Sequence, residues 1–490
     1  MAHFSYLPMI IGLPVLGAFC IFCIRGSERV TAVNSKNLAL WVSSVTFFLT
    51  LFVFFKFDFN SDKLQFAYES SGVESLMLSW ELGVNALSLP FMVLTAFFAL
   101  SAVLVTPKRL PMMKVFMIMI LMIEGFLLGT VCSRNLFQFF LFHEGTFIPL
   151  FMLSSLWNEK NKEQYPFKQY GTFFLSFVLF FFGILYLHSQ TGSLNLDSLA
   201  DTPFPPRVQE ILLFVFLPAF MINVPLAPFH SWFLKSQADM PVPCMLILSG
   251  AVSKLALYGT IAVLVSLSPD VMRSYMFWLM LWAACSAVYA AVSLFFCQDV
   301  KEKMVYMQMS LFSIAACAVF SLNAEAVFAV LLFCLTQSFS LAAFIIVLSF
   351  LFERTQSTDM ERFKGLGAEI PAFCTAFFVV SCCFAVLPAT PAFTPLFLMI
   401  QKIFSVGVSF GVAALICVVC VFAAIANLYA GTVFGERQQT FSPYADLKKR
   451  EKAQFFILSG LLFFSTVFLQ AFELPCVAGT RVISAFISAS

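Results

Sequence analysis

Four charged side chains stand inside long apolar stretches of this 490-residue sequence: Glu124, Glu144, Lys254 and Lys402. An ionisable residue at the centre of a membrane helix costs about 2.5–3.5 kcal/mol on insertion scales. Such residues therefore pair with one another, face a water-filled cavity or pass protons. Carboxylates and amines in these positions indicate proton or cation transport.

Two of the apolar stretches are also interrupted by prolines. A proline removes a helical hydrogen bond, and irregular backbone at membrane depth is tolerated only where protein or a water-filled cavity satisfies it. We therefore predict two discontinuous helices, and broken helices at matching places in two halves are typical of transporters with inverted repeats. The prolines are Pro225 and Pro228 in residues 209–233, and Pro388, Pro391 and Pro395 in residues 370–403.

Composition places these charges in a membrane. The sequence is 61% hydrophobic and 11% charged, with a mean hydropathy of +0.93, whereas soluble domains carry about 25% charged residues. Apolar runs of about 20 residues, enough to cross a bilayer as a helix, recur from end to end. We predict an all-α polytopic membrane protein with about fourteen transmembrane helices. They span residues 4–24, 37–56, 84–106, 111–131, 135–157, 166–188, 209–233, 242–266, 274–297, 303–322, 324–352, 370–403, 405–432 and 453–472.

The predicted helices group into four parts. Residues 1–106 hold helices 1–3, residues 111–266 a first five-helix repeat, residues 274–432 a second repeat, and residues 453–490 helix 14 with a tail. An odd number of helices per repeat gives the two repeats opposite topology, and the broken helix is the fourth of each. The first helix lacks a basic start and a small-residue cleavage site, so we expect it to be retained.

Lys and Arg are distributed unevenly over the connections between these spans. The connections after odd-numbered spans hold about 20 of them and the others about 6, and the richer side of a membrane protein faces the cytoplasm or matrix. We therefore expect the N-terminus on the non-cytoplasmic side. Marked examples on the basic side are Arg25, Arg29, Lys36, Lys108, Arg109, Arg354, Arg362, Lys364, Lys448, Lys449 and Arg450.

Several other kinds of site are not indicated. The net charge is +2 and no basic patch with interleaved aromatics occurs, so we expect no nucleic-acid partner. The fourteen cysteines lie mostly in apolar spans, and none has His or Cys partners at zinc or iron–sulfur spacing. No glycine-rich phosphate loop occurs. The chemistry is therefore left to ionisable groups inside the membrane.

Several stretches resemble one known family, in order along nearly the whole chain. LFHEGTFIPLFML resembles the family motif F-W-E-x-x-L-I-P-M-Y and matches its glutamate at Glu144. PFHSWFLKSQADMP resembles P-F-H-T-W-L-P-x-A-H-x-x-A-P, with Pro228, His230 and Trp232 matching. AVSKLALYG resembles L-L-K-x-x-x-Y-G and matches its lysine at Lys254. The chain is similar to the antiporter-like subunit M of bacterial respiratory complex I, equivalent to mitochondrial chain 4, in a family shared with Mrp-type antiporter subunits.

The resemblance implies a proton-translocating membrane-arm subunit of NADH:quinone oxidoreductase, with quinone reduction coupled to proton transport. NADH, FMN, iron–sulfur clusters and quinone would belong to partner subunits, so this chain would hold no redox centre, cofactor or metal. Its partners would be other membrane-arm subunits, the lipid bilayer and protons. We predict a proton relay of Glu144, Lys254 and Glu124, with Lys402 and Gln337 as further candidates. The broken-helix residues that would line the pathway are Asn223, Pro225, Pro228, His230 and Trp232.

The sequence departs from the family pattern at five charged or titrating positions. The usual aspartate before the third span is Asn85, and the lysine of the broken seventh helix is Asn223. The glutamate of the broken twelfth helix falls on Leu396, and the usual histidines fall on Leu311 and Gln337. None of these replacements titrates, so the second half of the pathway would be weakened.

Two alternatives therefore stay open. The chain could be a diverged, poorly conducting paralogue with a structural role in such a complex, or a Mrp-type subunit that exchanges cations for protons. The sequence leaves H⁺ and Na⁺ undistinguished. The expected location is the bacterial inner membrane, with the mitochondrial inner membrane as the alternative.

Overall fold

The computed structural model describes residues 6–61, 63–73, 78–108, 110–157, 165–355, 357–360, 364–435 and 446–488. Residues 4 and 5 of the first predicted span, and the basic-side residues Arg109 and Arg362, lie outside these ranges. The described chain divides into two compact units. The first comprises Met1–Val224, Asp239–Ser274 and Val477–Ser490, and the second comprises Pro225–Ala238 and Tyr275–Cys476.

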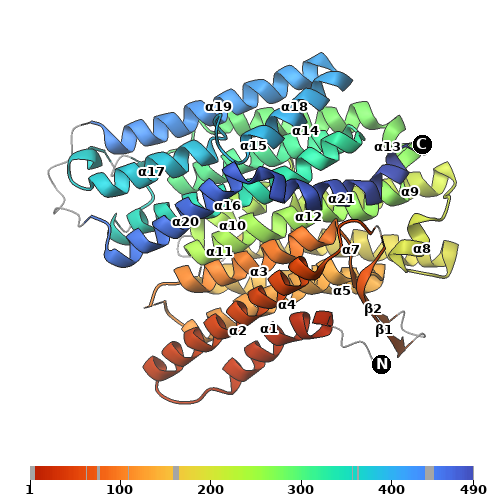
Figure 1. Ribbon diagram of the computed structural model, residues 1–490, viewed down its shortest axis with the longest axis horizontal. Helices are drawn as coiled ribbons and strands as arrows, with labels where there is room; N and C mark the ends of the chain where they lie inside the picture. The colour runs from red at the N-terminus through yellow and green to blue at the C-terminus, as the bar shows by residue number, and fades with distance from the viewer. Residues whose placement is uncertain are drawn as a thin grey trace. The chain divides into compact units, whose positions relative to one another are not determined.

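The first unit is a helical bundle in which α1 packs along α4, and α2 packs along α3 (Figure 1). Six of its described helices, α1, α2, α3, α4, α7 and α9, are each long enough to cross a bilayer. Two shorter helices, α5 and α6, follow each other to form one span. The helices are α1 Tyr6–Cys23, α2 Glu28–Lys56, α3 Ser88–Val105, α4 Met113–Cys132, α5 Leu136–Gly145, α6 Phe147–Trp157, α7 Tyr165–Thr191, α8 Leu196–Ala200, α9 Pro206–Asn223, α11 Val242–Ile247, α12 Ser253–Gly259 and α13 Pro269–Ser274.

The second unit is also helical, with α14 packed along α15 and α19, and α16 packed against α17, α18 and α20. A short 3₁₀ turn, Leu366–Ala368, precedes α17. The last helix, α21, begins in this unit and ends in the first. The helices are α10 Ser231–Asp239, α14 Met276–Ser293, α15 Val300–Phe320, α16 Ala324–Thr355, α17 Pro371–Phe384, α18 Phe393–Val406, α19 Val408–Val433, α20 Lys449–Val467 and α21 Leu469–Ser488.

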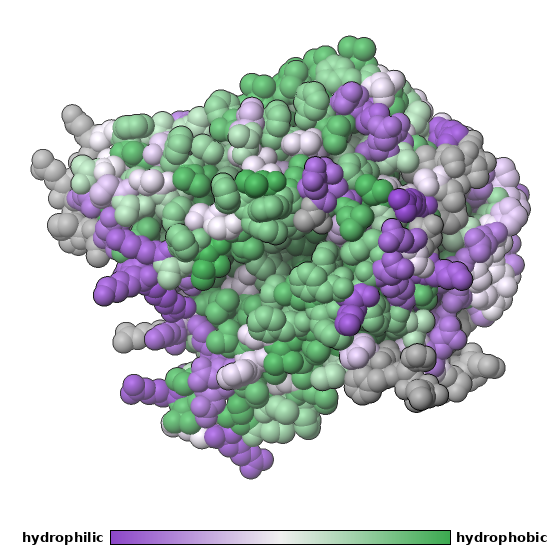
Figure 2. All heavy atoms as spheres, viewed as in Figure 1, coloured by the Kyte–Doolittle hydropathy of each residue, from purple (hydrophilic) through white to green (hydrophobic). Residues whose placement is uncertain are grey.

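The helices confirm a polytopic all-α membrane protein. Within the described ranges, twelve helices are long and apolar enough to cross a membrane, and the bent pair α20–α21 makes up to thirteen. The twelfth predicted span, residues 370–403, is divided between the shorter apolar helices α17 and α18. On the face shown in Figure 2, hydrophobic residues cover the middle of the helices and hydrophilic residues gather toward their ends, as a bilayer requires.

The predicted break in the seventh helix is present. Helix α9 ends at Asn223 and α10 begins at Ser231, so Pro225 and Pro228 lie in the irregular segment between them. The freed backbone of Ala227 is satisfied by side chains of α14 in the second unit. Its N–H donates to Ser286 Oγ at 3.0 Å, and its carbonyl accepts from the indole of Trp282 at 2.6 Å. Irregular backbone is thus paired within protein, as membrane depth demands.

The predicted break in the twelfth helix is also present, but only two of its three prolines form it. Helix α17 ends at Phe384 and α18 begins at Phe393, so Pro388 and Pro391 fall in the connection. Pro395 lies in the first turn of α18. A helix has no intrahelical acceptors for the N–H groups of its first turn, so a proline there interrupts nothing.

Two further features were not predicted. Strands β1, Gln65–Val73, and β2, Leu78–Val84, form an antiparallel hairpin in the connection before α3. The predicted span 242–266 is not one regular α-helix, because π-helical turns at Leu248–Val252 and Thr260–Val265 flank α12. π-turns inside α-helices occur frequently at functional sites.

Candidate functional site

Glu144 lies near the end of α5, a helix whose start is held by Asn135. The Asn135 side chain accepts from the backbone N–H groups of Phe137 at 2.9 Å and Gln138 at 3.4 Å, which satisfies two of the unpaired donors at the helix start. From this anchored end the helix carries Glu144 into the protein, where only 8% of the residue is exposed. A carboxylate at such burial requires polar partners.

Two side chains approach the Glu144 carboxylate. His143 Nδ1 lies 3.2 Å from Glu144 Oε1, and the hydroxyl of the fully buried Ser176 on α7 lies 3.2 Å from the same oxygen. The surroundings are apolar, since the His143 ring is stacked against both Phe139 and Phe180, with ring centroids 5.9 and 6.0 Å away. Glu144 is therefore a buried carboxylate whose polar contacts include one imidazole and one hydroxyl.

Ser176 also connects Glu144 to the broken helix. Its hydroxyl lies 3.2 Å from the carbonyl oxygen of Ala219 on α9. The same carbonyl accepts a hydrogen bond from Asn223 Nδ2 at 3.3 Å, in the last turn of α9. A hydroxyl has one proton to donate, so Ser176 can donate to the carboxylate or to the carbonyl in turn. This hydrogen-bonded chain links α5, α7 and α9.

Asn223 brings a second polar group to this place. The residue is fully buried, and its Oδ1 accepts no hydrogen bond from the described residues. Leaving a buried acceptor unsatisfied costs about 1–3 kcal/mol. The position where the family pattern has a lysine therefore holds a neutral amide, whose oxygen can accept a hydrogen bond.

Lys254 is 1% exposed and lies in α12, between the two π-helical turns. Its Nζ lies over the ring of Phe98 on α3, 5.2 Å from the ring centroid, within the range of a cation–π interaction. Phe98 is seated on Gly250 of the preceding π-turn. A Cβ at Gly250 would lie 2.2 Å from Phe98 Cε1, so only glycine leaves room for this ring.

The helix of Lys254 packs directly on the helix of Asn223. Gly259 of α12 faces Phe220 of α9, where an added Cβ would lie 2.4 Å from the ring. Within the first unit, each helix packs on the next along the path from Glu144 to Lys254, in the order α5, α7, α9 and α12. Helix α3, which carries Phe98, packs on α12. That Glu144 and Lys254 line one polar axis stays a prediction.

Glu124 is also buried, but on α4 and with a different partner. The hydroxyl of Ser43 on α2 donates to Glu124 Oε2 at 2.7 Å. The other oxygen, Oε1, accepts no hydrogen bond from the described residues. Glu124 is therefore placed in the N-terminal helices and not in the hydrogen-bonded chain of Glu144.

The remaining predicted residues belong to the second unit. His230 Nε2 lies 3.2 Å from the hydroxyl of Tyr289, and Trp232 is buried. Gln337 is buried in α16, and its Oε1 accepts no hydrogen bond from the described residues. Lys402 forms an ion pair with Glu325, whose side chain is 72% exposed, so Lys402 reaches toward the helix ends and not toward a buried axis.

Sequence reasoning missed the two serines that contact the buried carboxylates, Ser176 and Ser43. A serine within an apolar helix carries no distinctive signal, since it commonly bonds the carbonyl one turn back.

Across the described ranges, no group of three or more His, Cys, Asp or Glu residues could hold a metal ion.

Comparison with known proteins finds relatives that match most of the chain. The family model "NADH:quinone oxidoreductase/Mrp antiporter, TM" matches residues 133–422. The NADH-quinone oxidoreductase subunit M of Rickettsia bellii is 25% identical over 436 residues, which cover 88% of this chain and 87% of that protein. The NADH-ubiquinone oxidoreductase chain 4 of Marchantia polymorpha is 26% identical over 451 residues, or 91% and 90% of the two chains.

Solved structures share the fold. A chain of respiratory complex I from Thermus thermophilus with bound NADH superposes with a TM-score of 0.86 at 21% identity, covering 98% of this chain and 99% of that one. A chain of the Mrp complex from Dietzia sp. superposes with a TM-score of 0.85 at 14% identity, covering 100% and 99%. The same helical scaffold therefore occurs in both kinds of assembly.

Proposed function

This chain belongs to the NADH:quinone oxidoreductase/Mrp antiporter transmembrane family, and on that premise we propose that it moves protons as a membrane-arm subunit of NADH:quinone oxidoreductase. Its neighbours would be other membrane-arm subunits, and NADH, FMN, iron–sulfur clusters and quinone would be bound by partner subunits. The membrane would be a bacterial inner membrane, with the N-terminus on the non-cytoplasmic side. The mitochondrial inner membrane is the alternative.

The observation that carries this proposal is the buried chain from Glu144 through Ser176 to the Ala219 carbonyl and Asn223. A carboxylate can bind a proton. The Ser176 hydroxyl can donate to the ionised carboxylate or, when Glu144 is protonated, accept a hydrogen bond from it and donate to the Ala219 carbonyl, so the chain accommodates both protonation states of Glu144. The neutral Asn223 can orient this chain, but it adds no charge to bias it.

Lys254 is the second titrating group of the proposed relay. Its Nζ lies over the face of Phe98, 5.2 Å from the ring centroid. A lysine buried in this way can hold or release a proton. Protonation of Glu144 and deprotonation of Lys254 both reduce buried charge. The protonation states of Glu144 and Lys254 would therefore be coupled electrostatically across α9 and α12.

A specific observation favours the poorly conducting alternative as the second candidate. Leu396 and Leu311 are 2% and 1% exposed, at positions where the family pattern has titrating residues. Gln337, the third such position, is an amide that cannot exchange a proton. If the second half of the pathway must titrate, the chain would hold its place in the complex without conducting.

Proton uptake into vesicles, driven by the purified and reconstituted complex, tests the proposal. We expect Glu144→Gln and Lys254→Ala each to lower the protons moved per electron, and Lys402→Ala to leave the ratio unchanged. Wild-type uptake by both Glu144→Gln and Lys254→Ala would support the structural paralogue instead. Uptake that requires Na⁺ and survives without electron transfer would support a Mrp-type exchange.

A further inference from the structure

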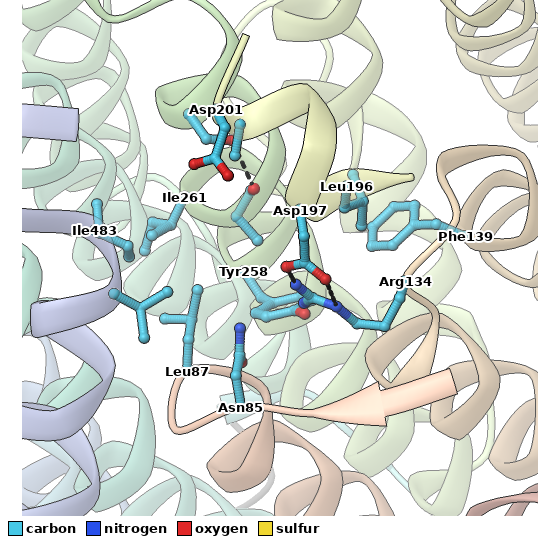
Figure 3. Close-up of a pocket in the computed structure, with 14 residues that line it drawn as sticks. Asn85, Leu87, Arg134, Phe139, Leu196, Asp197, Asp201, Tyr258, Ile261 and Ile483 are labelled. Carbon is cyan, nitrogen blue, oxygen red and sulfur yellow. Dashed lines mark hydrogen bonds and ion pairs between the residues drawn. The ribbon is translucent and has the colours of Figure 1, made fainter. Parts of the chain in front are cut away.

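A cavity of about 170 Å³ opens at one end of the first unit, outside the groups considered so far (Figure 3). Its wall includes Asn85 before α3, Arg134 between α4 and α5, Asp197 and Asp201 around α8, and Tyr258 of α12. This volume has room for several water molecules, and the polar side chains provide partners for them.

Backbone hydrogen bonds hold the segments of the cavity wall together. The N–H of Arg134 donates to the carbonyl of Glu81 in β2 at 2.8 Å, and its carbonyl accepts from Leu196 at 2.8 Å. Its guanidinium forms two hydrogen bonds to the Asp197 carboxylate, as Figure 3 shows. Burial lowers the pKa of Arg134, while Tyr258 and Glu81 act in the opposite direction.

The charge of the lining favours a cation. Arg134 contributes one positive charge, which its pair with Asp197 balances, and Asp201 adds a further carboxylate. The neutral Asn85 completes this side of the wall. Water and hydronium are therefore better suited to the cavity than an anion.

Tyr258 connects the cavity to Lys254. The two residues are one helical turn apart in α12, so they lie on the same face of the helix. Both pack on α3. The ring centroids of Tyr258 and Phe91 lie 5.2 Å apart, and Lys254 Nζ lies over the ring of Phe98. Tyr258 is 2% exposed, and its hydroxyl makes a long hydrogen bond of 3.4 Å to the Val131 carbonyl. A hydroxyl held this weakly can turn to another acceptor or donor.

We propose that this cavity is the aqueous port of Lys254, with the Tyr258 hydroxyl passing protons between the water in the cavity and the lysine. The proposal rests on the proton-moving function proposed above. All the loops around the cavity are connections with few basic residues, so the port opens to the non-cytoplasmic side. The protons of Lys254 would then exchange with that side inside the first unit, without the untitratable positions Leu311 and Leu396.

Proton uptake by the reconstituted complex tests the port with two variants. Ala262→Trp places a large ring in the cavity, which Ala262 lines, and should lower the protons moved per electron about as far as Lys254→Ala does. Tyr258→Phe keeps the ring and its packing on Phe91 and should lower them in the same direction, by no more than Lys254→Ala. The matched control is Ser274→Trp, on the exposed end of α13, which should behave as wild type.

Access is measured separately by labelling Ser266→Cys, another lining position, with a membrane-impermeant thiol reagent in sealed vesicles. Labelling only from the side opposite the basic loops, blocked by Ala262→Trp, supports the port. Labelling from the basic side overturns it. Wild-type uptake by Ala262→Trp and Tyr258→Phe, with uptake lowered by Lys254→Ala, overturns the port alone. Wild-type uptake by Lys254→Ala overturns the proposed function as well. If Ala262→Trp does not assemble, Tyr258→Phe decides.

Discussion

Glu144 and Asn223 meet at one backbone carbonyl, that of Ala219. Asn223 Nδ2 donates to this oxygen directly, and Glu144 reaches it through the hydroxyl of Ser176, which lies 3.2 Å from both the carboxylate and the carbonyl. A carboxylate on α5 and an amide on the broken helix α9 are thus connected by a serine of α7. A substitution of Asn223 can therefore affect Glu144 through this hydrogen-bonded chain.

Ser176→Ala is expected to lower proton uptake by the reconstituted complex on the order of tenfold, since a hydrogen bond to a charged group contributes about 1.5–3 kcal/mol. It removes the hydroxyl that joins Glu144 to Ala219 while keeping the helix. Ser189→Ala is the matched control, because Ser189 lies on the same helix, is exposed, and bonds only within its own turn, donating to the Tyr186 carbonyl and accepting from Gln190. Equal uptake by the two variants would contradict a role for Ser176 in the proton binding of Glu144.

Asn223→Lys is expected to raise the protons moved per electron. It restores a positive charge beside the carbonyl shared with Glu144, where the amide offers a hydrogen bond but no charge. In the wild-type background Lys254→Ala should lower uptake only in part, because coupling through a neutral Asn223 is weak. Abolished pumping in Lys254→Ala together with no change in Asn223→Lys would show that Asn223 does not limit the pathway.

Gly250→Ala is expected to destabilise the protein by about 1–3 kcal/mol, the usual cost of overpacking a well-filled core. The new methyl group would lie 2.2 Å from Phe98 Cε1 and would displace the ring that faces Lys254. The measurement is the midpoint of thermal unfolding of the purified complex in detergent. Gly12→Ala, where no atom lies within 4 Å of the added Cβ, is the control.

A second substitution separates crowding at Gly250 from other effects of the added methyl group. Phe98→Leu shortens the displaced side chain, so Gly250→Ala combined with Phe98→Leu should be less destabilised than the sum of the two single changes. Strict additivity of the unfolding midpoints would mean that the two positions do not crowd each other.

Lys402→Ala is expected to leave proton uptake within about twofold of wild type and to change stability by less than about 1 kcal/mol, as exposed ion pairs generally do. Its partner Glu325 is largely exposed, so the pair lies at a helix end. Charge reversal of both residues, Lys402→Glu with Glu325→Lys, should behave in the same way. A strong loss of uptake in Lys402→Ala would return this lysine to the relay.

Much of the fold could be predicted because its causes are local in sequence. A bilayer requires about 20 apolar residues for each crossing helix, and a proline removes a hydrogen bond wherever it stands within one. The spans and both helix breaks therefore follow from short windows of residues. Glu144 and Lys254 could be named for the same reason, since a lone charge within an apolar run needs a special environment.

Other features depend on which helix faces meet, and only the tertiary structure decided them. Ser176 and Tyr258 become candidates through distances to residues on other helices or to a cavity, and neither residue type is unusual in its own segment. Pro395 is tolerated because α18 begins just before it, and the π-turns around Lys254 leave no periodicity in the sequence that marks them. Hydropathy and proline chemistry act along the chain, whereas hydrogen-bond partners and cavities arise from packing between segments that are distant in it.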